Sequence, residues 1–143
     1  MTLKVYLADL THMDLGVASE AFPLNIGLIA SYAKKNFGKE LDITLFKYPQ
    51  DLLEALKEKT PHILGCSNYT WNCNLSYHFT ELAKSLDPET LVVWGGTNYP
   101  FQAVQQEKLL RRRSKVDIHI NYEGEKAFCN IVERCISVTT PKN

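Results

Sequence analysis

Five short strand-like runs, of which residues 41–47 alternate apolar and polar positions, are interspersed with five amphipathic segments, and no other feature of the sequence constrains the fold as strongly. The first run, residues 3–9, has the continuous apolar character of a strand that is buried on both faces. Further strands are expected at residues 41–47, 62–67, 91–94 and 116–121. Five βα units in succession predict an α/β fold with a parallel, doubly wound sheet and right-handed crossovers.

Apolar residues recur at helical spacing between these strands. The helices are expected at residues 23–37, 51–59, 72–86, 101–113 and 125–136. Asn25 is a candidate cap of the first helix, and Gly38 suits its end. Five units fit the strand order 2-1-3-4-5 of flavodoxin-like (Rossmann-like) sheets, with the switch point between the first and third strands. We expect residues 1–138 to form one domain and the polar residues 139–143 to begin a linker to a further domain.

Composition narrows the classes of function. The 16 Lys and Arg residues balance the 16 Asp and Glu residues, which argues against a general electrostatic attraction to nucleic acid or to a membrane. The basic residues gathered in 108–115 are interpreted as a solvated helix end. No apolar stretch is long enough to span a bilayer, and Met1 leads directly into a strand pattern rather than a secretory signal. The four cysteines have no Cys-x-x-Cys spacing, so we expect reduced thiols in a cytoplasmic protein.

Small and polar residues stand where the expected strands end. Asp9 closes the first strand, Ser67 closes the third, and Gly95 and Gly96 follow the fourth. In open α/β sheets this edge binds ligands, and the 2-1-3-4-5 order would bring the three ends together. The glycine pair would let the backbone approach a flat ligand, and a tight strand-to-helix turn would explain it equally well.

The loops after the third and fifth strands offer hydrogen-bonding groups. Ser67 and Thr70 carry hydroxyls, and Tyr69 offers an aromatic face with a polar tip. Helix capping would also account for the hydroxyls. In residues 123–125, two carboxylates flank a glycine at a helix start, where they favour the helix dipole or could accept hydrogen bonds from ribose or amide groups.

Conventional catalytic patterns are missing from the sequence. It contains no Gly-x-Gly-x-x-Gly, no P-loop, no Gly-x-Ser-x-Gly elbow and no His/Cys cluster with zinc spacing. His62 and His119 lie within strand patterns and are expected to be core or face residues, and His78 is expected at a helix surface. His12 lies in the long first loop, residues 10–22, and loops of such length are often functional.

Taken together, these loops resemble the cobalamin (B12)-binding domain of the type found at the N-terminus of B12-dependent radical S-adenosylmethionine (radical SAM) enzymes. The resemblance rests on four segments in the family's order, residues 22–32, 61–67, 92–100 and 116–128. It implies a flavodoxin-like module that is not catalytic alone, holds the nucleotide tail of cobalamin at the carboxyl edge of the sheet, and presents the cobalt to a partner domain. A radical methyl transfer or a related rearrangement is the reaction class that it implies for the full enzyme.

The resemblance also implies which residues hold the cofactor. The family's serine-containing motif falls on Ser67 and Tyr69, its double glycine falls on Gly95 and Gly96, and the Glu-Gly-Glu segment of the radical-enzyme branch falls on residues 123–125. The candidate cofactor-binding residues are Asp9, Leu10, Thr11, Pro23, Ser67, Asn68, Tyr69, Thr70, Gly95, Gly96, Thr97, Glu123, Gly124 and Glu125.

Two departures from related enzymes bear on the metal sites. Mutases and methionine synthase carry Asp-x-His-x-x-Gly, whose histidine ligates cobalt, but here His12 and Gly16 lie one and two residues too far from Asp9. His12 is thus a candidate ligand that the motif does not assign, and many radical-enzyme versions lack the motif. The Cys-x-x-x-Cys-x-x-Cys pattern is also absent, so the [4Fe-4S] cluster and S-adenosylmethionine are expected only in a partner radical SAM barrel.

Two other interpretations remain open at this point. A signalling receiver of the same fold would need an acidic residue after the third strand and a lysine after the fifth, where Ser67 and Asn121 stand. A degenerate domain would keep the fold, bind no cobalamin and act as a structural or homodimerising module. Trp71, Trp94 and Tyr99 could fill the pocket or pack against the tail, and a filled pocket would favour this degenerate module.

Overall fold

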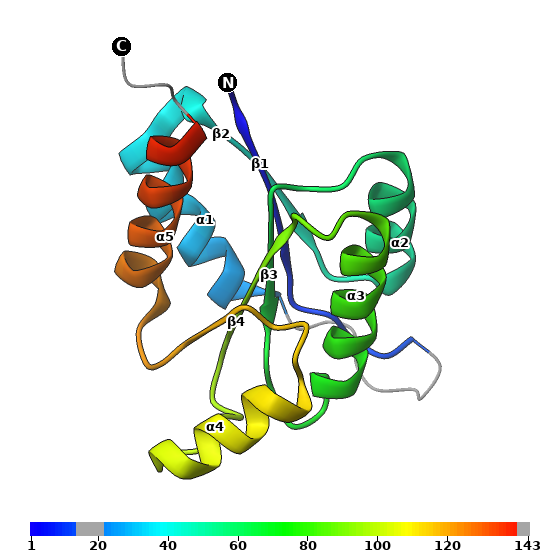
Figure 1. Cartoon of the computed structure of the whole chain (residues 1–143). Helices are drawn as coiled ribbons and strands as arrows, with labels where there is room; N and C mark the ends of the chain where they lie inside the picture. Colours follow the sequence, from blue (N-terminus) through cyan, green and yellow to red (C-terminus); the bar gives the residue numbers. More distant parts are fainter. Residues whose placement is uncertain (14–21, 140–143) are drawn as a thin grey trace.

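The computed structural model describes residues 1–13 and 22–139, in which a five-stranded parallel sheet lies between helices (Figure 1). The strands are β1 (Leu3–Ala8), β2 (Leu41–Phe46), β3 (Ile63–Ser67), β4 (Leu91–Gly95) and β5 (Ile118–Ile120). The helices are α1 (Leu24–Phe37), the short 3-10 helix η1 (Gly38–Glu40), α2 (Pro49–Glu58), α3 (Cys73–Leu86), α4 (Ala103–Arg112) and α5 (Gly124–Thr139). The strand order is β2-β1-β3-β4-β5 and every pairing is parallel, which confirms the predicted fold class and order.

All but one of the element boundaries lie within two residues of those expected. The exception is α5, which ends at Thr139, three residues after its expected end and at the first residue of the expected linker, whose remaining residues 140–143 lie outside the described residues. Helix α2 begins at Pro49 because proline needs no hydrogen-bond acceptor in the first turn of a helix. Strand β5 is only three residues long, although Asp117 still donates its backbone N–H to the carbonyl of Val92. The cap expected at Asn25 is wrong, because Pro23 precedes the helix and Asn25 lies inside its first turn.

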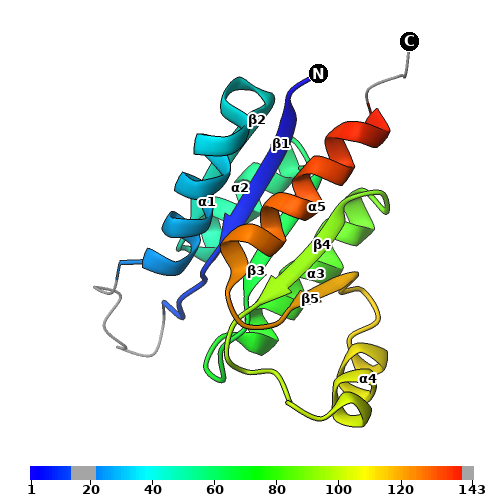
Figure 2. The same ribbon diagram turned by 90° about the vertical axis from the view of Figure 1, so that its left-hand side faces the viewer.

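The helices divide between the two faces of the sheet. Figures 1 and 2 show α1 and α5 on one face and α2 and α3 on the other. A hydrophobic core lies on each face of the sheet. Alternate residues of β1 belong to the two cores, because neighbouring side chains of a strand point to opposite faces. Val5 and Leu7 pack on the α1–α5 side with Phe128, whereas Tyr6 packs on the α2–α3 side with Phe79.

Helix α4 lies beyond the carboxyl ends of the strands in both views and has no fully buried residue (Figures 1 and 2). Its basic end is only partly the solvated helix end that the sequence suggested. Arg113 is half-buried, with its guanidinium carbon 5.1 Å from the centroid of the Tyr77 ring and 5.4 Å from that of Trp94. This cation therefore ties the end of α4 to the α3 side of the sheet.

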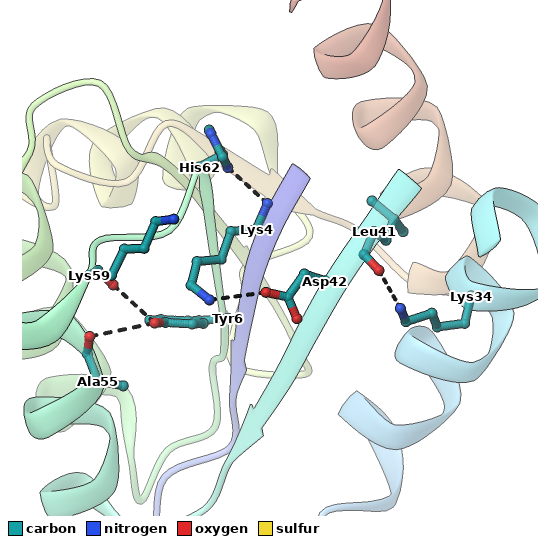
Figure 3. A network of polar contacts seen from close by, with 8 residues as sticks. All are labelled: Lys4, Tyr6, Lys34, Leu41, Asp42, Ala55, Lys59 and His62. Atoms are coloured by element: carbon teal, nitrogen blue, oxygen red, sulfur yellow. Dashed lines mark hydrogen bonds and ion pairs between the residues drawn. The ribbon is translucent and has the colours of Figure 1, made fainter. Parts of the chain in front are cut away.

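A set of polar contacts joins β1 and β2 to neighbouring segments (Figure 3). The backbone N–H of Lys4 donates to Nδ1 of His62 over 2.8 Å, and its amine pairs with Asp42 at 3.0 Å. Tyr6 donates its hydroxyl to the carbonyl of Lys59 over 2.9 Å, and the amine of Lys34 donates to the carbonyl of Leu41. His62 is exposed and lies just before β3, so the expectation that it is a core or face residue of this strand is wrong. Its ring nitrogen instead accepts a hydrogen bond from a backbone N–H group.

All four cysteines, Cys66, Cys73, Cys129 and Cys135, are free thiols. Among residues 1–13 and 22–139, no helix has both the length and the apolar composition needed to cross a membrane.

Candidate functional site

A pocket of about 550 Å³ opens at the carboxyl edge of the sheet, lined by residues of α1 and α5 and of the loops after β3, β4 and β5. Its lining includes Leu7, Val93 and Ile120, which are apolar and belong to the α1–α5 side of the sheet. Gly95 lies in the lining beside them, and a Cβ added to it would meet no atom closer than Ile120 at 3.9 Å. The missing side chain of Gly95 therefore leaves space above an apolar floor.

Polar groups from three loops surround this floor. The register of the sheet pairs Ser67 with Gly95, so the loops after β3 and β4 begin at the same level. The candidate residues that line the pocket are Ser67, Tyr69, Gly95, Gly96, Thr97, Glu123, Gly124 and Glu125. The fold thus gathers these eight residues, which are separated in the sequence, around one cavity.

The other candidate residues do not line the pocket, and each has another place. Leu10 is 1% exposed in the core on the α2–α3 side. Thr11 donates its backbone N–H to Lys47, Pro23 precedes α1, and Thr70 is exposed. Asp9 and Asn68 belong to two polar networks that hold the loops. These are the candidate residues that do not line the pocket: Asp9, Leu10, Thr11, Pro23, Asn68 and Thr70.

The first network joins the end of β1 to the end of β3. Ser67 donates its hydroxyl to Oδ1 of Asp9 over 2.5 Å. Asn72 donates its amide to the Ser67 hydroxyl over 3.0 Å and to the carbonyl of Leu10 over 3.2 Å. Helix capping by Ser67 is wrong, since the N-cap residue of α3 is Asn72 and no side chain caps this helix. A hydroxyl has two lone pairs, so Ser67 keeps one that can accept a hydrogen bond from a ligand.

The second network joins the loops after β3 and β4 to β5. The amide nitrogen of Asn68 donates to the carbonyl of Asn98 over 2.7 Å and lies 3.2 Å from Nε2 of His119. The amide of Asn98 donates in return to Oδ1 of Asn68 over 3.1 Å. The Tyr99 ring stacks on the His119 ring, with 3.6 Å between centroids.

His119 holds this network in its neutral form. Burial lowers the pKa of His119 to about 4, so the imidazole is uncharged near neutral pH. Its Nδ1 lies 3.1 Å from the carbonyl of Ile120, which fits an Nδ1–H donor and leaves Nε2 to accept from Asn68. The strand pattern correctly placed His119 in a strand, but it carried no sign of this polar role.

Gly96 is fixed by the same loops. Its φ is +133°, and an added Cβ would lie 2.6 Å from the carbonyl oxygen of Asn68 and 3.0 Å from its nitrogen. Only glycine fits such a close approach of backbone to backbone. Gly96 is therefore required by the packing of the β3 and β4 loops, in addition to its place in the pocket lining.

Aromatic residues and His12 gather beside the pocket. Asn25 donates its amide to the Tyr69 hydroxyl over 2.8 Å, and the Tyr69 and Trp71 rings stack with 4.7 Å between centroids. Nε2 of His12 lies 2.8 Å from the carbonyl of Trp71, so this nitrogen is the donor and Nδ1 stays available as a ligand. Gly16, which the metal-ligand motif would include, lies outside the described residues. The described part of the chain holds no group of three metal-ligating side chains, and the cobalt ligand stays a prediction.

None of the three aromatic residues considered as pocket fillers closes the pocket. Trp94 is fully buried and donates its Nε1–H to Thr80 of α3 over 3.0 Å, so its ring lies on the other face of the sheet. Trp71 is 66% exposed, and Tyr99 lies in the pocket wall with its ring on His119. The filled pocket that would favour a degenerate module is therefore not observed.

Several residues of the pocket were not found from the sequence. Ile26 and Ile29 of α1 and Phe128 of α5 form apolar walls, and their helical spacing predicted only that they face the sheet. Phe101 and Tyr122 line the pocket although each is 86% exposed. Two exposed aromatic side chains in loops give no signal in a single sequence.

Comparisons with known proteins bear on the family and on the fold. The model of the B12 binding domain matches residues 14–132. Three solved structures share the fold. The BeF3-activated DrrB receiver domain has a TM-score of 0.65 and 14% identity, over 96% of this chain and 99% of that one. A cobalamin-binding protein from Desulfitobacterium hafniense DCB-2 has a TM-score of 0.64 and 14% identity, over 96% of this chain and 59% of that one. The CheY-like protein TadZ from Pseudomonas aeruginosa PAO1 has a TM-score of 0.63 and 15% identity, over 100% of this chain and 99% of that one. No curated protein matches the sequence. At such low identities these likenesses show the fold alone, and this chain spans 59% of the cobalamin-binding protein.

Proposed function

We propose a function for this chain from one premise: it belongs to the B12-binding domain family. Family membership supports cobalamin as the ligand. We propose more specifically that the pocket at the carboxyl edge receives the nucleotide tail of cobalamin and leaves the corrin ring and the cobalt exposed. The observation that carries this proposal is an open pocket at the place where eight of the candidate residues converge.

The lining of the pocket suits such a tail. Its volume of about 550 Å³ lies within the range of roughly 300–1,000 Å³ typical of small-ligand sites. The apolar floor of Leu7, Val93 and Ile120 suits a flat aromatic base, and Gly95 leaves room for its plane. At the rim, Thr97 offers a hydroxyl for the ribose.

The role of the chain in this proposal is to bind and to orient. Cobalamin supplies the reactive carbon–cobalt chemistry, while the protein fixes the position of the cofactor and its access to water. The networks around Ser67 and Asn68 hold the loops before any ligand arrives, which lowers the entropy that binding must cost. No catalytic residue is assigned to this chain.

We also propose a partner for the exposed cobalt face. The Glu-Gly-Glu segment at residues 123–125 resembles the radical-enzyme branch, which supports a radical SAM barrel as that partner, with the [4Fe-4S] cluster and S-adenosylmethionine held there. The module would then act in a cytoplasmic radical methyltransferase or a related enzyme, with residues 1–138 as its cobalamin domain.

A binding titration with two corrinoids tests the placement of the tail. Cobalamin carries the nucleotide tail, and cobinamide is the same ring without it. The dissociation constants are measured by visible absorbance, and we expect wild type to bind hydroxocobalamin more tightly than cobinamide. The Gly95→Leu variant should lose this preference because its side chain fills the pocket, whereas Gly95→Ala should keep it because one methyl group makes only ordinary contact at 3.9 Å.

The outcomes separate the two functions that we consider. A folded wild-type chain that binds neither corrinoid would refute cobalamin binding and favour a structural or homodimerising module. Equal affinity of wild type for the two corrinoids would refute the placement of the tail in this pocket while leaving cobalamin binding intact.

A further inference from the structure

We infer that the rings of Tyr122 and Phe101 contact the part of the ligand that projects from the pocket. The strained backbone at Tyr122 positions its ring for this contact. The inference rests on the proposed function and deepens it. In cobalamin the projecting part is the corrin ring, a flat conjugated macrocycle fringed with carboxamides. Tyr122 would thus be a specificity-determining residue for the macrocycle rather than for the tail.

The backbone of Tyr122 is the first observation. Its φ is +62°, and it is the only non-glycine residue with positive φ within residues 1–13 and 22–139. For a bulky side chain this conformation is an outlier, and strain of this kind concentrates at ligand-binding sites, where the surrounding structure maintains it. Asn121 precedes it and Gly124 begins α5 two residues later, so the strain lies in the turn that leads into this helix.

The surroundings of the Tyr122 side chain are the second observation. The ring is 86% exposed, and in the described part of the chain its hydroxyl makes no hydrogen bond and its ring stacks on no other ring. Burial or bonding of the side chain within the fold therefore does not offset the strain. Tyr122 nevertheless lines the pocket, and from its exposure we infer that its ring lies beside the opening.

The wall formed by the β4–α4 loop carries a matching side chain. Phe101 lines the same pocket and is also 86% exposed, and Leu28 of α1 contributes a third apolar side chain that is 50% exposed. These apolar side chains come from different segments and surround one opening, which suits an apolar ring face. Glu123 and Glu125 lie in the same lining, where carboxylates can accept hydrogen bonds from carboxamide N–H groups. This combination fits a macrocycle with an apolar face and an amide fringe.

The experiment compares ring-deleting and ring-keeping variants with the two corrinoids. Tyr122→Asn removes the ring but keeps a residue that tolerates positive φ. Tyr122→Phe keeps the ring and removes the hydroxyl, and Phe101→Ala removes the ring of the β4–α4 loop. Tyr32→Ala is the matched control, because Tyr32 is an exposed aromatic residue outside the pocket lining. The measurements are the dissociation constants for hydroxocobalamin and cobinamide and the unfolding temperature of the free chain.

We expect Tyr122→Asn and Phe101→Ala each to weaken both corrinoids by about 3- to 10-fold, as the loss of an aromatic contact predicts. The same factor should appear for cobinamide, because the contact is made with the ring. Tyr122→Phe and Tyr32→Ala should bind like wild type. The unfolding temperature of Tyr122→Asn should equal or exceed that of wild type, because strain is relieved and no contact within the fold is lost.

Four results would overturn the inference. Unchanged affinity of Tyr122→Asn would show that the ring does not touch the ligand. A loss confined to hydroxocobalamin would assign the ring to the tail, and a fall in unfolding temperature would give Tyr122 a structural role. If wild type binds neither corrinoid, the proposed function fails and this inference fails with it. The first two results can be obtained only when wild type binds a corrinoid, so they refute the inference and leave the proposed function intact.

Discussion

Two adjacent glycines offer a sharp test of how the carboxyl edge is built. At position 96 an alanine would have to adopt the positive φ of Gly96, which costs about 1–2 kcal/mol. Its methyl group would also lie 2.6 Å from the carbonyl oxygen of Asn68, and because this is backbone, we add strain on the order of 1–3 kcal/mol. At Gly95 the nearest atom is 3.9 Å away and φ is not positive, so a methyl group fits without strain.

We therefore expect Gly96→Ala to lower the free energy of unfolding by roughly 2–5 kcal/mol, which corresponds to roughly 5–20 °C in unfolding temperature for a domain of this size. Gly95→Ala should be neutral or stabilising by up to about 1 kcal/mol, since alanine lowers the entropy of the unfolded chain. Urea unfolding followed by far-ultraviolet circular dichroism measures both. If the two variants unfold within about 1 kcal/mol of each other, the close approach of Gly96 to Asn68 does not govern this edge.

Three further predictions follow from the described contacts. Because burial lowers the pKa of His119 to about 4, the unfolded chain binds a proton between about pH 6.5 and 4 that the folded chain does not, so stability should fall as pH falls through this window. After allowance for the partial exposure of the ring, we expect the free energy of unfolding to fall by about 1–2 kcal/mol across this window. The His119→Gln variant should not show this fall, and urea unfolding of both proteins at pH 6.5 and at pH 4 measures it. Ser67→Ala should lower the free energy of unfolding by about 1–2 kcal/mol, because it removes the hydrogen bond to the Asp9 carboxylate. Thr70→Ala, which removes an exposed hydroxyl, should change this free energy by no more than about 0.5 kcal/mol. Burial raises the pKa of Cys66 to about 12, so iodoacetamide should label the half-buried Cys73 in the folded chain and spare Cys66, as peptide mass spectrometry would show.

The sheet order could be predicted because it depends on features that are local in the sequence. Strand and helix patterns alternate, and right-handed crossovers leave few arrangements of five units. The position of α4 could not be predicted in the same way. It has no fully buried residue, and Arg113 lies over the rings of Tyr77 and Trp94, which are distant in the sequence. An amphipathic pattern says that a helix has an apolar side, but not how deeply that side is buried.

The site shows the same division between local and distant information. Ser67 and Gly95 were placed at one edge because parallel strands end together, and the register pairs them. The bond from Asn68 to His119 could not be predicted, because it joins residues 51 positions apart through side-chain geometry alone. The positive φ of Tyr122 was equally hidden, since tyrosine rarely adopts it and nothing in the sequence marks the exception.

The two polar networks meet at neighbouring residues of the β3 loop, and this gives the pocket its stiffness. Ser67 is held towards β1 by Asp9, while Asn68 is held towards β4 and β5 by Asn98 and His119. The loops after β1, β3 and β4 are thus fixed to one another through a segment of two residues. Under the proposed function, a ligand that enters the pocket meets loops that are already held in place, so the ordering cost of binding would fall on the exposed aromatic rim. Among the described non-glycine residues, a positive φ is found at Tyr122 on the rim, where no hydrogen bond within the fold restrains the side chain, and not at Ser67 or Asn68 in the hydrogen-bonded loops.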